Sequence, residues 1–355
     1  MRVAIDATPL TLSSGGLQRY TLELAVALAE NFPEDEIFLV SDQPFRMPHT
    51  SPLNLRRGGG PRNPAERRWW LWGLDRELHR LDAAVFHGTD FAVPYVPRRP
   101  SILTLHDLSP WMDASWHSEA DRVRQRTPLL IGLGLAHVIV TPTEAVRKQA
   151  MERFRVRPER IRAIPHAAAA CFRPLDAPPA APYFLFAGTL EPRKNIPGLL
   201  AAWREVRRSH AVDLVLAGRR RSDFAQLSPE PGLQIIGEVS DERLAELLAG
   251  ALAFAYPSLY EGFGLPVLEA MQCGACVITS RDPAISEVAG GAAIQAGSHA
   301  ELVQAMLDVA AHPEWARPWR ERALRRAAEF SWRRTARLTR ETYEEALGRS
   351  AERGQ

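Results

Sequence analysis

One stretch of the sequence, residues 255–271 (AYPSLYEGFGLPVLEAM), constrains the fold more than any other. An apolar run at residues 251–255 leads into a turn-prone loop with two glycines, and Pro266 then opens a helical pattern, where its missing N–H costs nothing. Gly274 closes this helix, and residues 275–279 form the next apolar run. The order strand, loop, helix, strand predicts a parallel α/β unit whose loop lies at the carboxyl end of a strand, where open α/β sheets bind their ligands.

The residues of this loop suit a phosphate-containing ligand that also carries hydroxyls. Gly262 and Gly264 let the backbone approach a ligand closely, and the helix that opens at Pro266 offers free N–H groups to an anion. Two carboxylates, Glu261 and Glu269, flank the anion position. Because a carboxylate aimed at a phosphate would repel it, these two are better placed to accept hydrogen bonds from the ribose and hexose hydroxyls on either side of a diphosphate. The structural alternative is that Glu269 only supports the helix N-terminus.

Composition describes an ordinary protein with room for two domains. The chain has 355 residues, 46% of them hydrophobic and 24% charged, with a formal net charge of +2 that does not favour nucleic acid as the main partner. No apolar run reaches the 18 residues that a membrane-spanning helix needs. Three cysteines make no disulfide framework, which suits the cytoplasm, and Cys273 and Cys276 lack the further ligands that a metal site requires.

Short apolar segments alternate with longer helical patterns along the whole chain, which predicts parallel sheets with crossover helices. A proline-dense segment at residues 172–182 predicts a linker, and the alternation of apolar segments and helical patterns restarts directly after it. The expected organisation is one α/β domain at residues 1–171, a linker at 172–182, a second α/β domain at 183–334 and a final helix at 335–355. The expected strands are 3–7, 37–40, 84–87, 101–105, 137–141, 183–187, 214–217, 233–236, 251–255 and 276–279, and the expected helices of the first half are 18–30, 64–81, 120–135 and 144–154.

The segment E-G-F-G-L-P-x-L-E-A-M resembles the signature of the retaining glycosyltransferases of family GT4, which have the GT-B fold. This resemblance implies an α/β chain of two Rossmann-like domains whose parallel sheets face a central cleft. The domain at residues 1–171 would bind the acceptor and the one at 183–334 the donor, and the helix at 335–355 would return to the first domain. It also implies a metal-independent transfer of a hexosyl group from a nucleotide-sugar donor to an acceptor hydroxyl, with no cofactor. Glu261 would contact the donor sugar and Glu269 the ribose. The other donor-binding residues implied within the signature are Gly262, Phe263, Gly264 and Leu265.

A second loop, at residues 186–195, resembles the phosphate loop of the same family, in which a lysine contacts the donor diphosphate. Lys194 matches that lysine and is expected to be catalytic. The family often has an arginine directly after the glycine, where this chain has Thr189, so Arg193 or Arg219 would have to supply the missing cation. Further along, the segment that contains Gly237 and Val239 resembles the one whose backbone meets the nucleobase, and it leaves the base unidentified.

The first half carries the remaining candidates. His106 ends a strand where the family has a histidine close to the donor sugar, and it is expected to be catalytic together with Lys194 and Glu261. Gly15 and Gly16 form a glycine-rich loop before the first helix, expected to approach the donor phosphate or the acceptor. His87 and Asp90 also follow a strand and are candidates for the acceptor, with a structural turn as the alternative.

The motifs together look most like bacterial mannosyltransferases that build surface polysaccharide, so GDP-mannose is the favoured donor and UDP-hexoses are the alternative. The acceptor would be a sugar, a lipid-linked intermediate or another hydroxyl compound. A nucleotide-sugar epimerase, a phosphorylase and a non-catalytic nucleotide-binding module remain as other readings. The basic and tryptophan-rich segment at residues 67–72 favours a core-packed helix, while peripheral contact with the inner face of the membrane stays open.

Overall fold

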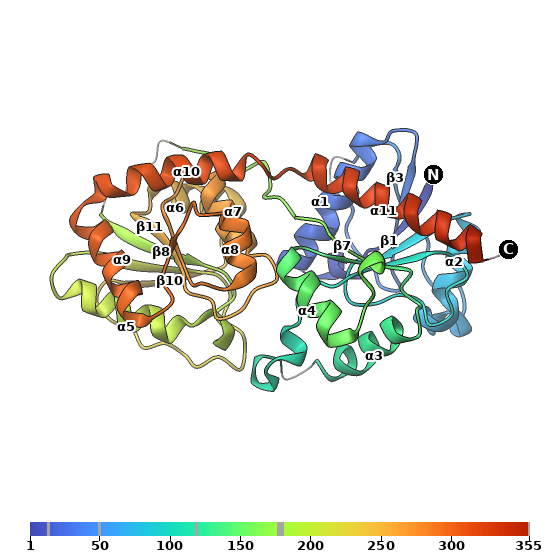
Figure 1. The fold of residues 1–355 in the computed structure, drawn as a ribbon, viewed down its shortest axis with the longest axis horizontal. Coiled ribbons are helices and arrows are strands. Elements are labelled where there is room, and N and C mark those ends of the chain that lie inside the picture. Colours follow the sequence, from blue (N-terminus) through green and yellow to red (C-terminus); the bar gives the residue numbers. More distant parts are fainter. Residues whose placement is uncertain (13–14, 49–50, 118–119, 176–180, 354–355) are drawn as a thin grey trace. The chain divides into compact units, whose positions relative to one another are not determined.

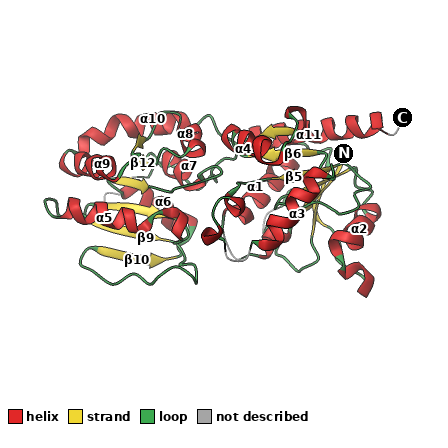
Figure 2. Cartoon of the chain, turned by 60° about the horizontal axis from the view of Figure 1, so that its bottom comes forward, coloured by secondary structure: helices red, strands yellow, loops and turns green. Residues whose placement is uncertain are grey.

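The computed structural model describes residues 1–12, 15–48, 51–117, 120–175 and 181–353. They form two compact units, each with its own parallel sheet and flanking helices (Figures 1 and 2). Unit 1 comprises Met1–Met112, His117–His166 and Ser331–Gln355, and unit 2 comprises Asp113–Trp116 and Ala167–Phe330. Within the segment expected as a linker, residues 176–180 lie outside the described residues.

Unit 1 is built on a seven-stranded sheet in the order β3-β2-β1-β4-β5-β6-β7, in which every neighbouring pair is parallel. Its strands are β1 (Arg2–Asp6), β2 (Glu36–Val40), β3 (Leu55–Arg57), β4 (Val85–Gly88), β5 (Ser101–Thr104), β6 (Val138–Thr141) and β7 (Ile161–Ala163). Its α-helices are α1 (Gly16–Asn31), α2 (Leu74–Arg80), α3 (Asp121–Gly132), α4 (Glu144–Phe154) and α11 (Trp332–Arg353). The direction of sheet growth reverses between β1 and β4, so the loops that follow these two strands diverge at that point.

Unit 2 repeats this plan with six parallel strands in the order β10-β9-β8-β11-β12-β13. Its strands are β8 (Tyr183–Ala187), β9 (Asp213–Ala217), β10 (Leu233–Gly237), β11 (Ala253–Tyr256), β12 (Val277–Thr279) and β13 (Ile294–Gln295). Its α-helices are α5 (Ile196–Arg207), α6 (Asp241–Gly250), α7 (Leu265–Gln272), α8 (Pro283–Ala289), α9 (His299–Ala311) and α10 (Arg317–Ala327). The reversal here lies between β8 and β11.

Both sheets are parallel throughout, which confirms the expected α/β class. The predicted strands agree with the observed ones to within one or two residues at most ends, because a strand covered on both faces reads as a continuous apolar run. The sequence analysis missed β3, β7 and β13. These are the edge strands with three, three and two residues, too short to show a pattern.

The helix expected at residues 64–81 is broken. A 3-10 turn (Pro64–Arg67) and a π-helical turn (Trp69–Gly73) precede α2. The backbone folds back here so closely that a Cβ on Gly73 would lie 2.1 Å from the carbonyl oxygen of Glu66. Trp69 is buried, as a core-packed segment requires, whereas Trp72 is 47% exposed, as contact with a membrane surface would require.

The last helix, α11, packs against α1 within unit 1 (Figure 1). The buried hydroxyl of Tyr343 in α11 lies 2.8 Å from Nδ1 of His87 in β4, which ties the helix to the sheet. None of the helices described is both long and apolar enough to span a membrane.

Candidate functional site

The signature loop connects β11 to α7 at the carboxyl end of the unit 2 sheet. Gly264 caps α7 in the left-handed region (φ +87°), which a glycine adopts without strain, and Pro266 follows in the first turn as expected. Gly274, also left-handed (φ +72°), follows the end of the helix. Phe263 is buried and packs edge-on against Phe330, which fixes the loop on the body of unit 2.

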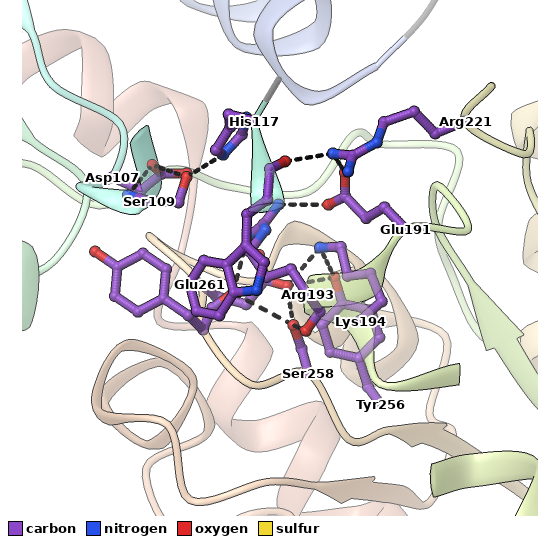
Figure 3. Close-up of polar contacts among 12 residues, drawn as sticks. Asp107, Ser109, His117, Glu191, Arg193, Lys194, Arg221, Tyr256, Ser258 and Glu261 are labelled. Carbon is purple, nitrogen blue, oxygen red and sulfur yellow. Dashed lines mark hydrogen bonds and ion pairs between the residues drawn. The ribbon is translucent and has the colours of Figure 1, made fainter. Parts of the chain in front are cut away.

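Glu261 is the centre of the polar contacts in this loop (Figure 3). Its Oε1 accepts hydrogen bonds from Ser258 (2.6 Å), Tyr256 (3.0 Å) and the Lys194 ammonium. Its Oε2 accepts from Nη1 of Arg193 at 3.0 Å. Burial by itself raises the pKa of Glu261, but the charges of Arg193 and Lys194 outweigh it and bring the pKa to about 2. The carboxylate therefore stays ionised and can only accept hydrogen bonds.

Lys194 reaches Glu261 from the loop that follows β8, on the other side of the reversal point. Its side chain is buried, and Nζ donates to the hydroxyl of Tyr256 at 2.6 Å as well as to Glu261. Burial and the nearby Arg193 lower the pKa of Lys194, and Glu261 and Glu191 oppose that shift. The two bonds use two of the three ammonium donors, and no acceptor within the described residues is assigned to the third.

A second carboxylate, Glu191, completes the cluster. It accepts from Nη2 of Arg193 at 2.9 Å and from Nη1 of Arg221 at 3.1 Å, so Arg193 bridges the two carboxylates (Figure 3). Arg221 also donates through Nε to Asp223, so the three cations Arg193, Lys194 and Arg221 are matched by three carboxylates at the point where the loops after β8 and β11 diverge. An anionic ligand with adjacent hydroxyls matches this arrangement.

Thr189 lies beside the cluster in the same loop. The loops after β8 and β9 touch, since Gly188 (φ +142°) and Gly218 (φ +134°) approach so closely that a Cβ on Gly218 would lie 2.0 Å from the Gly188 carbonyl oxygen. The backbone N–H of Leu190 donates to the carbonyl oxygen of Arg219 at 2.9 Å, which brings Arg219 next to Thr189.

The two candidate cations for the Thr189 position differ in their surroundings. Arg193 is largely buried and held by Glu191, Glu261 and the Tyr260 carbonyl oxygen. The side chain of Arg219 is exposed, and within the described part of the chain no hydrogen bond or ion pair is assigned to it.

The remaining unit 2 candidates lie at the same edge of the sheet. Gly237 ends β10 in the left-handed region (φ +70°), and its carbonyl oxygen accepts from the N–H of Gly218 at 2.6 Å. Val239 is half-buried, and Glu269 is buried in α7. Gly262 lies in the signature loop, and Leu265 is the first residue of α7.

Unit 1 holds the other candidates at the carboxyl ends of its strands. His106 follows β5, and its Nε2 donates to the carbonyl oxygen of Thr89 at 2.7 Å, while Tyr20 packs edge-on against the ring. Burial lowers the pKa of His106, although the Thr89 contact and the charge of Asp90 oppose the shift. Burial likewise raises the pKa of Asp90, against the charges of His106 and Arg126.

His87 lies close by but is committed to the fold. It is fully buried, and its two ring nitrogens contact Tyr343 (2.8 Å) and Thr104 (2.7 Å). Burial lowers its pKa to about 3. An acceptor contact by this ring would require one of these bonds to break, so the geometry supports the structural alternative for His87. Gly15 (φ +118°) caps α1, which begins at Gly16, and a Cβ there would meet nothing within 4 Å.

Four residues of the unit 2 cluster were not among the predicted site residues: Glu191, Arg221, Tyr256 and Ser258. Tyr256 ends β11 and Ser258 follows it, so the rule that ligands bind at the carboxyl ends of parallel strands could have marked both. Glu191 and Arg221 lie in the loops after β8 and β9, where the same rule applies.

Two comparisons by sequence cover nearly all of the chain. Residues 14–169 match the family described as Glycosyltransferase Family 4, and residues 171–326 match the family described as Glycosyl transferases group 1. The O-antigen chain mannosyltransferase B of Escherichia coli is 31% identical to this chain, over 94% of this chain and 96% of the relative. An MMP alpha-(1->4)-mannosyltransferase of Mycolicibacterium hassiacum is 30% identical over 60% of this chain and 55% of the relative.

Solved structures agree on the fold. A sucrose-phosphate synthase from Thermosynechococcus elongatus superposes with a TM-score of 0.79 at 19% identity, over 98% of this chain and 99% of that chain. Anabaena HepE, solved in complex with UDP-glucose, gives a TM-score of 0.71 at 16% identity, over 97% and 100% of the two chains. The motifs, the two parallel sheets and these matches agree: the chain is a GT-B glycosyltransferase and belongs to family GT4, the group 1 glycosyltransferases.

Proposed function

We propose that this glycosyltransferase moves a mannosyl group from GDP-mannose to an acceptor hydroxyl, with retention at the anomeric carbon and without a metal, in the synthesis of a surface polysaccharide or glycolipid. The observation that carries the proposal is the buried contact between Lys194 and Glu261 at the reversal point of the unit 2 sheet. This is the position at which open α/β folds bind nucleotides.

Lys194 and Glu261 suit the two halves of a nucleotide-sugar. The third ammonium donor of Lys194 is available for a phosphate oxygen, and a charge-assisted hydrogen bond of this kind favours a diphosphate over a neutral ligand. In Glu261, Oε1 already accepts three hydrogen bonds, whereas Oε2 accepts one from Arg193. Oε2 is therefore the oxygen with a lone pair to spare for a hydroxyl of the donor sugar.

The proposed course is a front-face transfer. The leaving diphosphate takes the proton of the acceptor hydroxyl while the bond between C1 and the phosphate oxygen breaks through an oxocarbenium-like state. Lys194 and the positive end of the α7 helix dipole stabilise the charge that develops on the leaving phosphate. Glu261 orients the sugar, and His106 keeps its predicted role as a catalytic residue contributed by unit 1.

Two comparisons bear on the donor. The relatives from E. coli and M. hassiacum are mannosyltransferases by name, which supports a mannosyl donor. Anabaena HepE was solved with UDP-glucose, and a UDP-sugar therefore stays the second candidate.

The first experiment is a calorimetric titration of the protein with GDP, UDP, ADP and dTDP in parallel, with EDTA present. Selective GDP binding is expected. Selective UDP binding would move the donor to glucose or an N-acetylhexosamine and call for an epimerase assay without acceptor. Binding of none of the four would refute the donor site built on Lys194 and Glu269. A binding module without catalysis would bind a nucleotide yet show no transfer that depends on Glu261 and Lys194.

Arg219 is the cation we expect to act in place of the arginine that Thr189 replaces. Arg219→Ala should weaken binding of the preferred nucleoside diphosphate by roughly 3- to 30-fold, as the loss of one exposed charge-assisted contact does. Arg220→Ala is the matched control, because the Arg220 guanidinium donates to the carbonyl oxygen of Phe224 instead. Equal affinities of both variants and the wild type would exclude Arg219 from the phosphate site.

A further inference from the structure

The side chain of Tyr256 is rigidly held beneath the Lys194–Glu261 contact. It is the last residue of β11 and is fully buried. Phe186 and Phe254 lie almost parallel to its ring, at centroid distances of 5.6 Å each and interplanar angles of 13° and 18°. A ring packed in this way has little freedom, so its hydroxyl occupies a fixed point.

The direction of each hydrogen bond at this hydroxyl follows from its partners. An ammonium can only donate, so the Tyr256 oxygen accepts from Nζ of Lys194 at 2.6 Å. An ionised carboxylate can only accept, so the Tyr256 O–H donates to Oε1 of Glu261 at 3.0 Å. The hydroxyl therefore lies between the two charged groups and satisfies both.

The choice of cation at this point is informative. The chain has 44 Lys and Arg residues in all, of which only Lys148 and Lys194 are lysines. An ammonium is a compact charge whose three donors can face separate acceptors, whereas a guanidinium is a planar fork. The buried point between Tyr256 and Glu261 suits the compact ion.

We propose that Tyr256 is a positioning residue whose hydroxyl fixes the Lys194 ammonium beside Glu261 with one donor directed to the donor diphosphate. This inference rests on the proposed function for its consequence in catalysis. A neutral acceptor holds the ammonium without cancelling its charge, which a further carboxylate at this point would do.

Loss of the hydroxyl has a predictable electrostatic effect. The charged groups around Lys194 are Arg193 and Glu191 from its own loop and Glu261 from the signature loop. In Tyr256→Phe the buried ammonium loses one acceptor, while the repulsion from Arg193 remains. The charged form is then less stable, so the pKa of Lys194 falls further. As the pH rises, activity that depends on the charged ammonium should therefore disappear at a lower pH in Tyr256→Phe than in the wild type.

The matched control is Tyr183→Phe. Tyr183 is at the opposite end of β8, and its hydroxyl donates to the carbonyl oxygen of Leu247 at 2.7 Å. Both variants remove one hydroxyl from the same unit, but only Tyr256 contacts Lys194. The two lysines make a direct measurement practicable, because NMR of protein labelled at lysine Cε contains two signals and Lys148→Arg assigns them.

Titration of the Lys194 signal tests the inference without any substrate. The midpoint in Tyr256→Phe is expected at a pH roughly one unit below that of the wild type, with Tyr183→Phe unchanged. Equal midpoints in all three proteins would overturn the positioning role. This result does not depend on the donor, so it stays separate from a failure of the proposed function.

Transfer assays with the donor identified by calorimetry supply the second readout. Tyr256→Phe should lower kcat roughly 10- to 100-fold, with the alkaline limb of the pH profile at lower pH and a smaller change in KM. Tyr183→Phe should leave both kcat and the alkaline limb of the pH profile unchanged. If Tyr256→Phe had the same kcat and the same alkaline limb of the pH profile as Tyr183→Phe, the proposed effect of Tyr256 on catalysis would be refuted.

Discussion

Replacement of Lys194 by methionine separates the catalytic role of the ammonium from its structural one. Methionine has a similar length without the charge, so the change removes two hydrogen bonds and one ion pair. Glu261 keeps its contacts with Arg193, Ser258 and Tyr256. Because the buried carboxylate is still paired, the free energy of unfolding should fall by about 1–3 kcal/mol, less than the 3–5 kcal/mol typical when a buried charge is left alone.

The expected loss of catalysis is larger. Removal of one group that stabilises charge on the leaving atom costs about 10²–10³-fold in kcat. A double variant, Lys194→Met with Glu261→Gln, tests whether stability and activity change together, since it replaces the ion pair with two neutral side chains. We expect it to be no more stable than Lys194→Met, because Glu261→Gln also removes the carboxylate that pairs with Arg193. Its activity should stay at or below that of the single variant.

Urea unfolding gives the stability of the wild type and the variants, and transfer from the donor identified by calorimetry gives kcat. Near wild-type turnover in Lys194→Met would mean that the loop after β8 has been wrongly assigned to the phosphate. A double variant that regained activity together with stability would show that Lys194 acts only through the fold. Either result would contradict the argument from the contacts of Glu261.

Two further predictions concern stability. The pKa of Glu261 is about 2 in the folded protein against 4.5 as the reference value, so its charge contributes about 3 kcal/mol that is present above pH 4.5 and lost as the pH falls towards 2. Urea unfolding of wild type and Glu261→Gln at pH 7 and pH 3 checks this, and a wild type that loses no more stability in acid than the variant would contradict it. Gly218→Ala should cost at least about 2 kcal/mol, because its φ is +134° and its new Cβ would meet the Gly188 carbonyl oxygen, whereas Gly348→Ala, an uncrowded site in α11, should be neutral or stabilising. Thermal unfolding compares the two variants, and equal melting temperatures would disprove the close approach.

The sequence predicted the parts of the fold that are governed by local pattern. α4 and β8 begin and end where the apolar runs and flanking signals placed them, at Glu144–Phe154 and Tyr183–Ala187. Three of the four edge strands, β3, β7 and β13, escaped detection because their few residues are held by pairing to a neighbour, a long-range contact without a local pattern. The break in the helix near Gly73 likewise depends on a contact with Glu66 that only the folded chain reveals.

The candidate site shows the same division. Lys194 and Glu261 were predicted from motifs, and the structure brings them into contact across 67 positions of sequence. Their roles toward a donor stay predictions. The contact itself could not be predicted from spacing, because it depends on the neighbouring places of β8 and β11 in the sheet. Tyr256 is marked in the sequence only by its place at the end of a buried strand, where an aromatic residue is usually part of the core.

The carboxylates of the cluster explain how such a site can exist before the donor binds. Arg193, Lys194 and Arg221 placed together without anions would repel one another at the end of a sheet where little water enters. Glu191 and Glu261 offset this repulsion and hold the cations in fixed positions, so less reorganisation is needed when a diphosphate arrives. Asp223 offsets the third cation through Nε of Arg221, so the proposed attraction for an anion rests on the remaining ammonium donor of Lys194 and on the exposed Arg219. The threonine at position 189, where the family often has an arginine, fits this charge balance. A fourth cation inside the cluster would have no carboxylate to pair with. Arg219 lies at the exposed edge instead, where water stabilises its charge in the absence of a phosphate.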